Sequence, residues 1–205
     1  VLRADLPGRT KLEAVFHLTA NFNYLLMTAL ALVIVPALFI RAAVEGHGLS
    51  LVELPLFGAA TLSVVNFYAL SQYEVRADWL SRLKYIPALM AMGIGLSVNN
   101  TKAVFGGLSA RRGDFARTPK YGVTRTPDDW STKRYHQSAQ VQPLVELGLG
   151  LYFTAAVLYA VSVGVLAPLP FLLLFQAGFL FTGLLSLVQQ MNATEPLLRA
   201  HAPTP

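Results

Sequence analysis

The chain has 205 residues and a formal net charge of +5, and 54% of its residues are hydrophobic while only 13% are charged. That balance excludes an ordinary soluble domain, and the apolar residues fall in long runs typical of transmembrane helices. Because the chain contains no cysteine, disulfides, thiolate metal sites and a cysteine nucleophile are also excluded.

The first elements are a lead-in helix and a pair of spans. Residues 1–21 contain an amphipathic run, K-L-E-A-V-F-H-L, which predicts a cytoplasmic lead-in helix. A bilayer crossing takes roughly 20 apolar residues, so residues 22–40 and 54–72 predict a transmembrane hairpin within residues 22–72. The chain begins at Val1 without a signal-peptide pattern. We therefore expect either a processed start or a longer polypeptide upstream.

The next apolar run, residues 85–98, is short for a span. Runs of about 10–14 residues are more often interfacial or re-entrant, and this one contains Pro87, Gly93 and Gly95. We predict an interfacial helix within residues 73–108, with Trp79 and Tyr85 as its anchors at the level of the lipid headgroups.

Basic residues decide the predicted topology, because Lys and Arg collect in cytoplasmic loops. If residues 85–98 span the membrane, the basic segment 109–142 lies opposite the basic N-terminal segment. If they lie in the interface, all of the 16 Lys and Arg residues except Arg41 fall on one side. The sequence therefore predicts an all-α integral membrane protein with four transmembrane helices. Its location is the cytoplasmic (inner) membrane, and both termini are cytoplasmic.

The C-terminal part begins with a polar segment, residues 109–142, which is long for a connector and so is expected to be functional or disordered. Residues 143–187 predict a second transmembrane hairpin, and residues 188–205 a cytoplasmic tail. Small residues recur every four positions on the third span, at Ala156, Ala160 and Gly164. This stripe predicts close packing against another helix, either the fourth span or a different subunit.

Few residues in the spans could carry chemistry. Glu146 lies in the first turn of the third span, where an acidic side chain near the interface complements the helix dipole. Gln176 lies near the centre of the fourth span and is expected to pin one helix to another. The four histidines share no ligand spacing and none is in mid-membrane: His17, His47, His136 and His201. We therefore expect no cofactor and no metal site.

The strongest positive cluster lies in the polar segment and consists of Arg111, Arg112, Arg117, Lys120 and Arg125. Two interpretations remain open. The cluster is attracted to anionic lipid headgroups, at about 1 kcal/mol for each basic residue near the surface, or it binds a diphosphate. The expected partners are a lipid bilayer with anionic headgroups and other membrane polypeptides, and not nucleic acid.

Residues 115–120 read F-A-R-T-P-K and resemble the F-x-V-T-x-K gating loop of processive family 2 membrane glycosyltransferases, the cellulose and glucomannan synthase-like enzymes. The order of the predicted elements is similar to the C-terminal transmembrane portion of that family. The resemblance implies that the loop closes over a nucleotide-sugar donor. It also implies that Phe115, Thr118 and Lys120 contact the nucleotide, with Lys120 neutralising phosphate charge. Arg117 stands where the family pattern has valine.

The catalytic motifs of that family, D-x-D, T-E-D and Q-x-x-R-W, do not occur in this sequence. Without their carboxylates there is no metal site for the leaving diphosphate and no base for the acceptor hydroxyl. We therefore predict that this chain alone is no enzyme. It is expected to be a non-catalytic transmembrane module that acts as a membrane anchor, channel or gating part beside a missing catalytic domain. The alternative is a stand-alone structural or scaffold subunit of a larger membrane complex, for example a photosynthetic or respiratory one.

Overall fold

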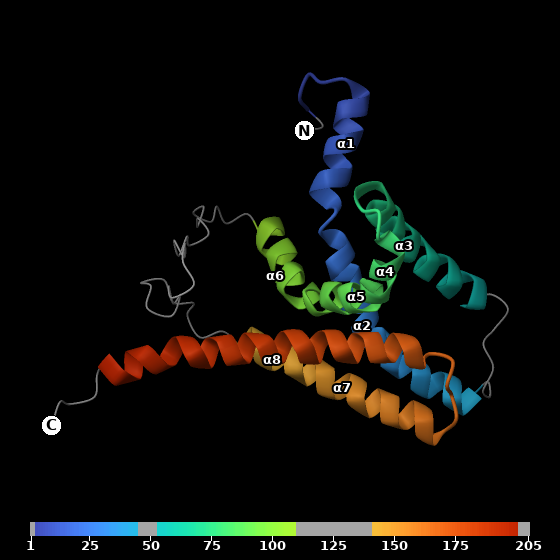
Figure 1. Cartoon of the computed structure of the whole chain (residues 1–205), viewed down its shortest axis with the longest axis vertical. Coiled ribbons are helices and arrows are strands. Elements are labelled where there is room, and N and C mark those ends of the chain that lie inside the picture. Colours follow the sequence, from blue (N-terminus) through green and yellow to red (C-terminus); the bar gives the residue numbers. More distant parts are fainter. Residues whose placement is uncertain (1–2, 45–52, 110–140, 201–205) are drawn as a thin grey trace.

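The computed structural model describes residues 3–44, 53–109 and 141–200, and the elements in these ranges are all helical, as predicted (Figure 1). In chain order they are α1 (Gly8–Thr19), α2 (Phe22–Val44), α3 (Glu53–Val75), α4 (Trp79–Arg82), the 3₁₀ turn η1 (Leu83–Tyr85), α5 (Ile86–Gly95), α6 (Ser97–Leu108), α7 (Gln142–Ser162) and α8 (Leu169–Ala200).

Three of these helices are long and apolar enough to cross a membrane, which fits an integral membrane protein. They are α2 over Phe22–Ala43, α7 over Gln142–Ser162 and α8 over Leu169–Met191. They coincide with three of the four predicted spans. The helix at the remaining position, α3, is not among the three, and its described part contains Asn66, Gln72 and Glu74. The second predicted span, residues 54–72, therefore stays a prediction.

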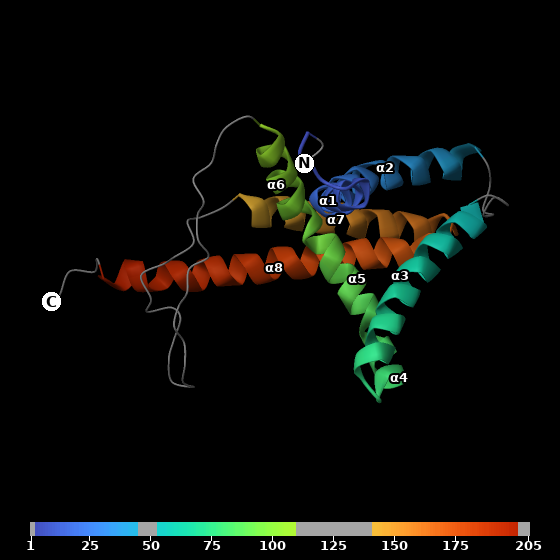
Figure 2. The same cartoon turned by 90° about the horizontal axis from the view of Figure 1, so that it is seen from above.

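The core lies where α2, α7 and α8 pack side by side (Figures 1 and 2). Phe153 of α7 is at its centre and is fully buried. Its ring stacks on Phe175 of α8, with the centroids 5.0 Å apart, and lies 5.9 Å from the ring of Phe179. Such aromatic pairs add to the stabilisation from burial alone. Alanine and branched aliphatic residues complete the shared core: Ala31, Val35, Leu38, Ala156, Ala160 and Leu172.

Glycines bring the α7–α8 hairpin together and close its turn. A Cβ atom on Gly150 would lie 2.5 Å from Leu180 Cδ2, and one on Gly183 would lie 2.9 Å from the backbone nitrogen of Leu147. Only glycine fits such approaches without a shift of the neighbouring helix. Gly164 follows the end of α7 with a φ of 76°, a left-handed conformation that favours glycine. The Val165 amide donates to Ala160 O at 2.9 Å, which completes a Schellman turn.

The segment predicted as one interfacial helix is instead divided into α4, η1, α5 and α6. Pro87 lies in the first turn of α5, where its missing N–H is not needed and its fixed φ suits the start of a helix. Leu96 separates α5 from α6 and has a φ of −70° and a ψ of −10°. The continuous helix was therefore a wrong prediction, because the proline begins a new helix at this position.

Helix α5 crosses α8 at close range (Figure 2). A Cβ atom on Gly95 would lie 2.5 Å from the carbonyl oxygen of Gly178 and 2.7 Å from Thr182 Oγ1. On the other side, a Cβ atom on Gly178 would lie 3.1 Å from the backbone nitrogen of Gly95 and closer still to the carbonyl oxygen of Ala91. The two backbones therefore meet with no side chain between them.

A second attachment holds the next helix, α6, to α2. Thr101 Oγ1 donates to the carbonyl oxygen of Tyr24 at 3.1 Å and lies 2.9 Å from Thr28 Oγ1. The α4–α6 segment is thus fixed to α8 at Gly95 and to α2 at Thr101. Helix α3 contacts the beginning of this segment, where the ring of Tyr73 meets Trp79 edge-on at 5.6 Å.

The last helix is longer than predicted. Residues 188–205 were expected to be a tail, but α8 continues to Ala200. Residues 188–195 contain neither glycine nor proline, so nothing in the sequence ends the helix at residue 187.

The crossing of α5 and α8 predicts opposite effects for two glycines on one helix. We expect Gly95→Ala to lower the stability by about 1–3 kcal/mol, because its methyl group would meet the backbone of α8. Gly93→Ala is the matched control, since a Cβ atom at Gly93 meets nothing within 4 Å, and alanine favours the helix. Thermal unfolding of the purified protein in detergent measures both, and equal Tm values for the two variants would contradict the crossing.

Candidate functional site

The site predicted from the loop motif lies outside the described residues. This holds for the expected nucleotide contacts, Phe115, Thr118 and Lys120, and for the basic residues Arg111, Arg112, Arg117 and Arg125. The described helices on either side of that segment are α6, which ends at Leu108, and α7, which begins at Gln142.

The small-residue stripe is placed in two different environments. Ala156 and Ala160 are buried in the core that α2, α7 and α8 share. Gly164 lies beyond the last residue of α7 and forms the turn toward α8. The glycines that α7 and α8 use for close approach are Gly150 and Gly183, which the spacing argument did not identify.

Polar contacts inside the hairpin include one that was predicted. Gln176 Nε2 of α8 donates to Thr154 Oγ1 of α7 at 2.9 Å. The prediction that Gln176 pins one helix to another is therefore confirmed.

Glu146 is the most unusual side chain of the described chain. It was expected in the first turn of the span, near the interface, but α7 begins at Gln142 and has no acidic residue in its first turn. Glu146 is only 2% exposed. One carboxylate oxygen, Oε1, accepts a hydrogen bond from Gln142 Nε2 at 2.8 Å. The other oxygen, Oε2, is buried and has no hydrogen-bond partner among the described residues. Glu146 belongs to the buried face of α7 together with Pro143, Gly150 and Phe153, and this common face explains its burial.

Two further polar residues are buried among the described ones. Ser97, at the start of α6, is fully buried and its hydroxyl has no hydrogen-bond partner. Thr182 of α8 is 8% exposed, and its hydroxyl donates to the carbonyl oxygen of Gly178 at 2.9 Å. A buried polar group without a partner costs about 1–3 kcal/mol, so each such group in a native structure requires an explanation.

The register of α2 and α7 places Glu146 level with α6. The Tyr152 hydroxyl donates to the carbonyl oxygen of Leu32 at 3.2 Å, an offset of 120 residues. Phe39 and Tyr159, at the same offset, have ring centroids 4.2 Å apart. The two helices therefore run parallel, and the same offset sets Glu146 level with Leu26. That position lies between Tyr24 and Thr28, the two residues that Thr101 of α6 contacts.

Helix α8 contacts both α7 near Glu146 and α5 near Ser97. Gly183 lies against Leu147, the residue after Glu146, and Thr182 lies against Gly95. Ser97 follows Gly95 by two residues. Glu146, Ser97 and Thr182, with Gln142, therefore belong to one region where α6, α7 and α8 meet beside α2. We call these four residues the Glu146 cluster.

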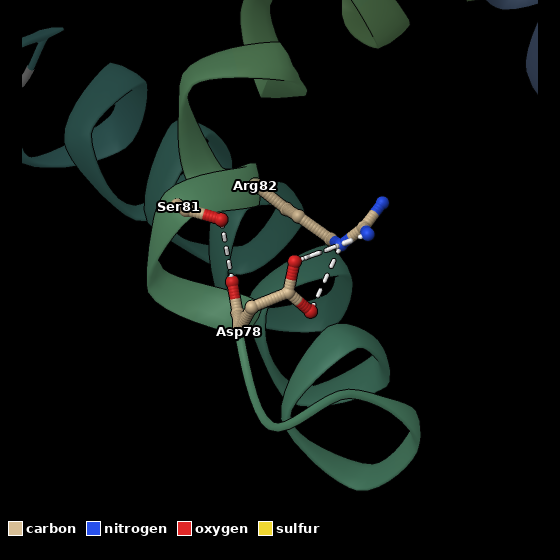
Figure 3. Close-up of polar contacts among 3 residues, drawn as sticks. All are labelled: Asp78, Ser81 and Arg82. Carbon is tan, nitrogen blue, oxygen red and sulfur yellow. Dashed lines mark hydrogen bonds and ion pairs between the residues drawn. The ribbon is translucent and has the colours of Figure 1, made fainter.

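A separate polar contact lies at the start of α4. Arg82 Nε donates to both carboxylate oxygens of Asp78, at 3.2 and 3.3 Å, and the Ser81 hydroxyl donates to the backbone carbonyl of Asp78 at 2.7 Å (Figure 3). The hydrogen bond from Arg82 lowers the pKa of Asp78, and the guanidinium charge contributes to the same effect. This exposed pair joins the first and last turn of the short helix α4, from Asp78 just before Trp79 to Arg82 at its end.

Comparisons with known proteins give no family assignment. No family model, no curated protein and no solved structure matches the chain. Among the described residues, no group of three or more His, Cys, Asp or Glu side chains could hold a metal ion. The described part of the chain therefore defines only a broad class of protein: it is all helical, and three of its helices are long and apolar enough to cross a membrane.

The ion pair at Asp78 has a defined pH dependence. Because the pKa of Asp78 is lowered in the folded protein, the pair contributes stability above the unfolded pKa of Asp, about 3.9. That contribution is lost as the pH falls through the folded value. We expect Arg82→Gln to return the titration of Asp78 toward its ordinary range in NMR spectra. Lys84→Gln is the control, since Lys84 lies over the ring of Tyr85. An unchanged titration of Asp78 in Arg82→Gln would refute the assigned cause.

Proposed function

We propose that this chain is a non-catalytic transmembrane module, related to the C-terminal portion of family 2 glycosyltransferases, that anchors and positions a partner polypeptide. The observation that carries the proposal is the double attachment of the α4–α6 segment, at Gly95 on α8 and at Thr101 on α2. A segment attached twice to apolar helices holds a fixed position relative to the membrane, as an anchor must.

The double attachment also bears on the proposed gating role. Residues 109–142 connect α6, which is hydrogen-bonded to α2, with α7, which forms the core with α8. Both helices that border this segment are therefore part of one frame. Because residues 115–120 resemble the gating loop, we propose that these packed helices hold the loop beside the donor site of a catalytic partner.

We propose that the module has four spans, with α3 as the second span and both termini on the cytoplasmic side of the inner membrane. The distribution of Lys and Arg supports this topology. The proposed interfacial region is α4 and η1. There the apolar side chains of Leu80 and Tyr85 are 65% and 59% exposed, next to the exposed Lys84. Such a mixture suits the boundary between lipid and water.

Single cysteines test the topology, and the natural sequence needs no prior cysteine removal because it has none. In a four-span protein, Cys at Ala4 and at Ser109 react from the same side of the membrane and Cys at Leu166 from the opposite side. If α3 does not cross, Ser109 and Ala4 lie on opposite sides. Labelling with an impermeant maleimide on oriented membrane vesicles distinguishes the two, and the second pattern would refute four spans.

Nucleotide protection tests the proposed relation to a glycosyltransferase. With the catalytic partner present, we expect uridine or guanosine diphosphate to protect residues 114–122 from proteolysis. Lys120→Ala should lose this protection because its ammonium group would no longer pair with phosphate. Lys133→Ala is the control, since it changes a basic residue of the same segment outside the motif. Absence of protection in the unmodified chain would remove the gating role. Co-purification with a large complex that transfers no sugar would then favour the scaffold alternative.

A further inference from the structure

The Glu146 cluster contains a negative charge that the packed helices do not balance. Within α7, α5, α6 and the span of α8, the only other charged residue is Lys102, whose side chain is exposed. On α2 the only charged residue is Arg41, which the 120-residue offset sets level with Val161 at the far end of α7. No counter-charge to this carboxylate is present on these described helices. Because an unbalanced buried carboxylate is strongly unfavourable, a bound cation or a proton would stabilise it.

The oxygen-bearing side chains of the Glu146 cluster favour a cation with oxygen ligands. Glu146 Oε2 and Ser97 Oγ have no hydrogen-bond partner in the part of the chain that the structure describes, and Thr182 Oγ1 uses its proton on Gly178 O, which leaves its lone pairs available. Three oxygen atoms without sulfur or imidazole suit hard cations rather than zinc or copper. A single carboxylate carries one negative charge, which a monovalent cation balances, whereas calcium sites take 6–8 oxygen ligands.

We propose that the Glu146 cluster binds one alkali cation, with Glu146 Oε2, Ser97 Oγ and Thr182 Oγ1 as its protein ligands. Gln142 orients the carboxylate through its hydrogen bond to Oε1. The ligands come from α7, α6 and α8, so the cation joins the start of α6 to the α7–α8 hairpin. This inference is independent of the proposed relation to glycosyltransferases.

The first experiment measures the Tm of the purified full chain in detergent at neutral pH, in sodium, potassium or choline chloride of equal ionic strength. A ligand that binds only the folded state raises its stability by mass action. We expect sodium or potassium to raise the Tm by roughly 3–6 °C over choline when the cation is at about ten times its Kd. Glu146→Gln should abolish this difference, and Ser97→Ala should reduce it.

The control variant is Gln176→Leu, which removes the hydrogen bond between α8 and α7 at Thr154. We expect it to lower the Tm in every salt and to keep the difference between sodium or potassium and choline. Equal Tm values of the unmodified chain in all three salts would overturn the proposal. A Tm that rises only as the pH is lowered would also overturn it, because a proton would then neutralise Glu146.

A direct measurement keeps the proposal testable if Glu146→Gln fails to fold. Radioactive sodium, or the thallous ion as a potassium analogue, should bind the unmodified chain with a stoichiometry near one. The Ser97→Ala chain should bind it several-fold more weakly, while Gln176→Leu should bind it unchanged. No binding to the unmodified chain, or equal weakening in both variants, would refute a site at the Glu146 cluster.

Discussion

The approach of α5 to α8 without intervening side chains is the constraint on which the rest of this fold depends. At Gly95 and Gly178 the two backbones are so close that neither position can carry a Cβ atom without a shift. Since lipid is as apolar as leucine, helices in a membrane gain little from hiding apolar surface and much from close packing. The crossing therefore fixes α5 on α8, and through Leu96 it fixes where α6 begins and where Thr101 reaches α2.

The buried polar residues lie close to the crossing of α5 and α8. Thr182 contacts Gly95 at the crossing, Ser97 begins the helix that leaves it, and Glu146 lies next to Leu147, which packs on Gly183. A region in which backbones are held this rigidly suits polar ligands, because their positions are set in advance. The same rigidity makes an unbalanced charge there costly, which is why Glu146 needs an explanation beyond the dipole of its own helix.

The sequence predicted the helices that length and composition determine. It missed the helix boundaries and contacts that packing against neighbouring helices determines. Residues 22–40 and the two C-terminal spans were found because long apolar runs have few alternatives. The interfacial segment was predicted as one helix although its short apolar run contains Pro87, which lies in the first turn of α5. The hydrogen bond of Gln176 followed from its chemistry alone, since a lone amide in a span needs a partner.

The candidate site shows the same division. Glu146 was predicted to lie in the first turn of a span, but α7 has no acidic residue in its first turn, and Glu146 lies on the buried face of that helix. Likewise, the four-residue spacing selected Ala156, Ala160 and Gly164, while the contacts of the hairpin assign close approach to Gly150 and Gly183. Periodicity identifies a face of a helix, and only the packed structure identifies what covers that face.

The parallel register of α2 and α7 also has a consequence for biogenesis. Partners on these helices are 120 residues apart, so α2 leaves the ribosome long before α7 exists to cover its inner face. Helices α7 and α8 follow one another through a tight turn and can enter the membrane as a pair, whereas α2 must wait there with Ala31, Val35 and Leu38 facing lipid or a chaperone. The final step of assembly is then the docking of a late hairpin onto an early helix. Any factor that shields α2 in the interval would act before the core exists.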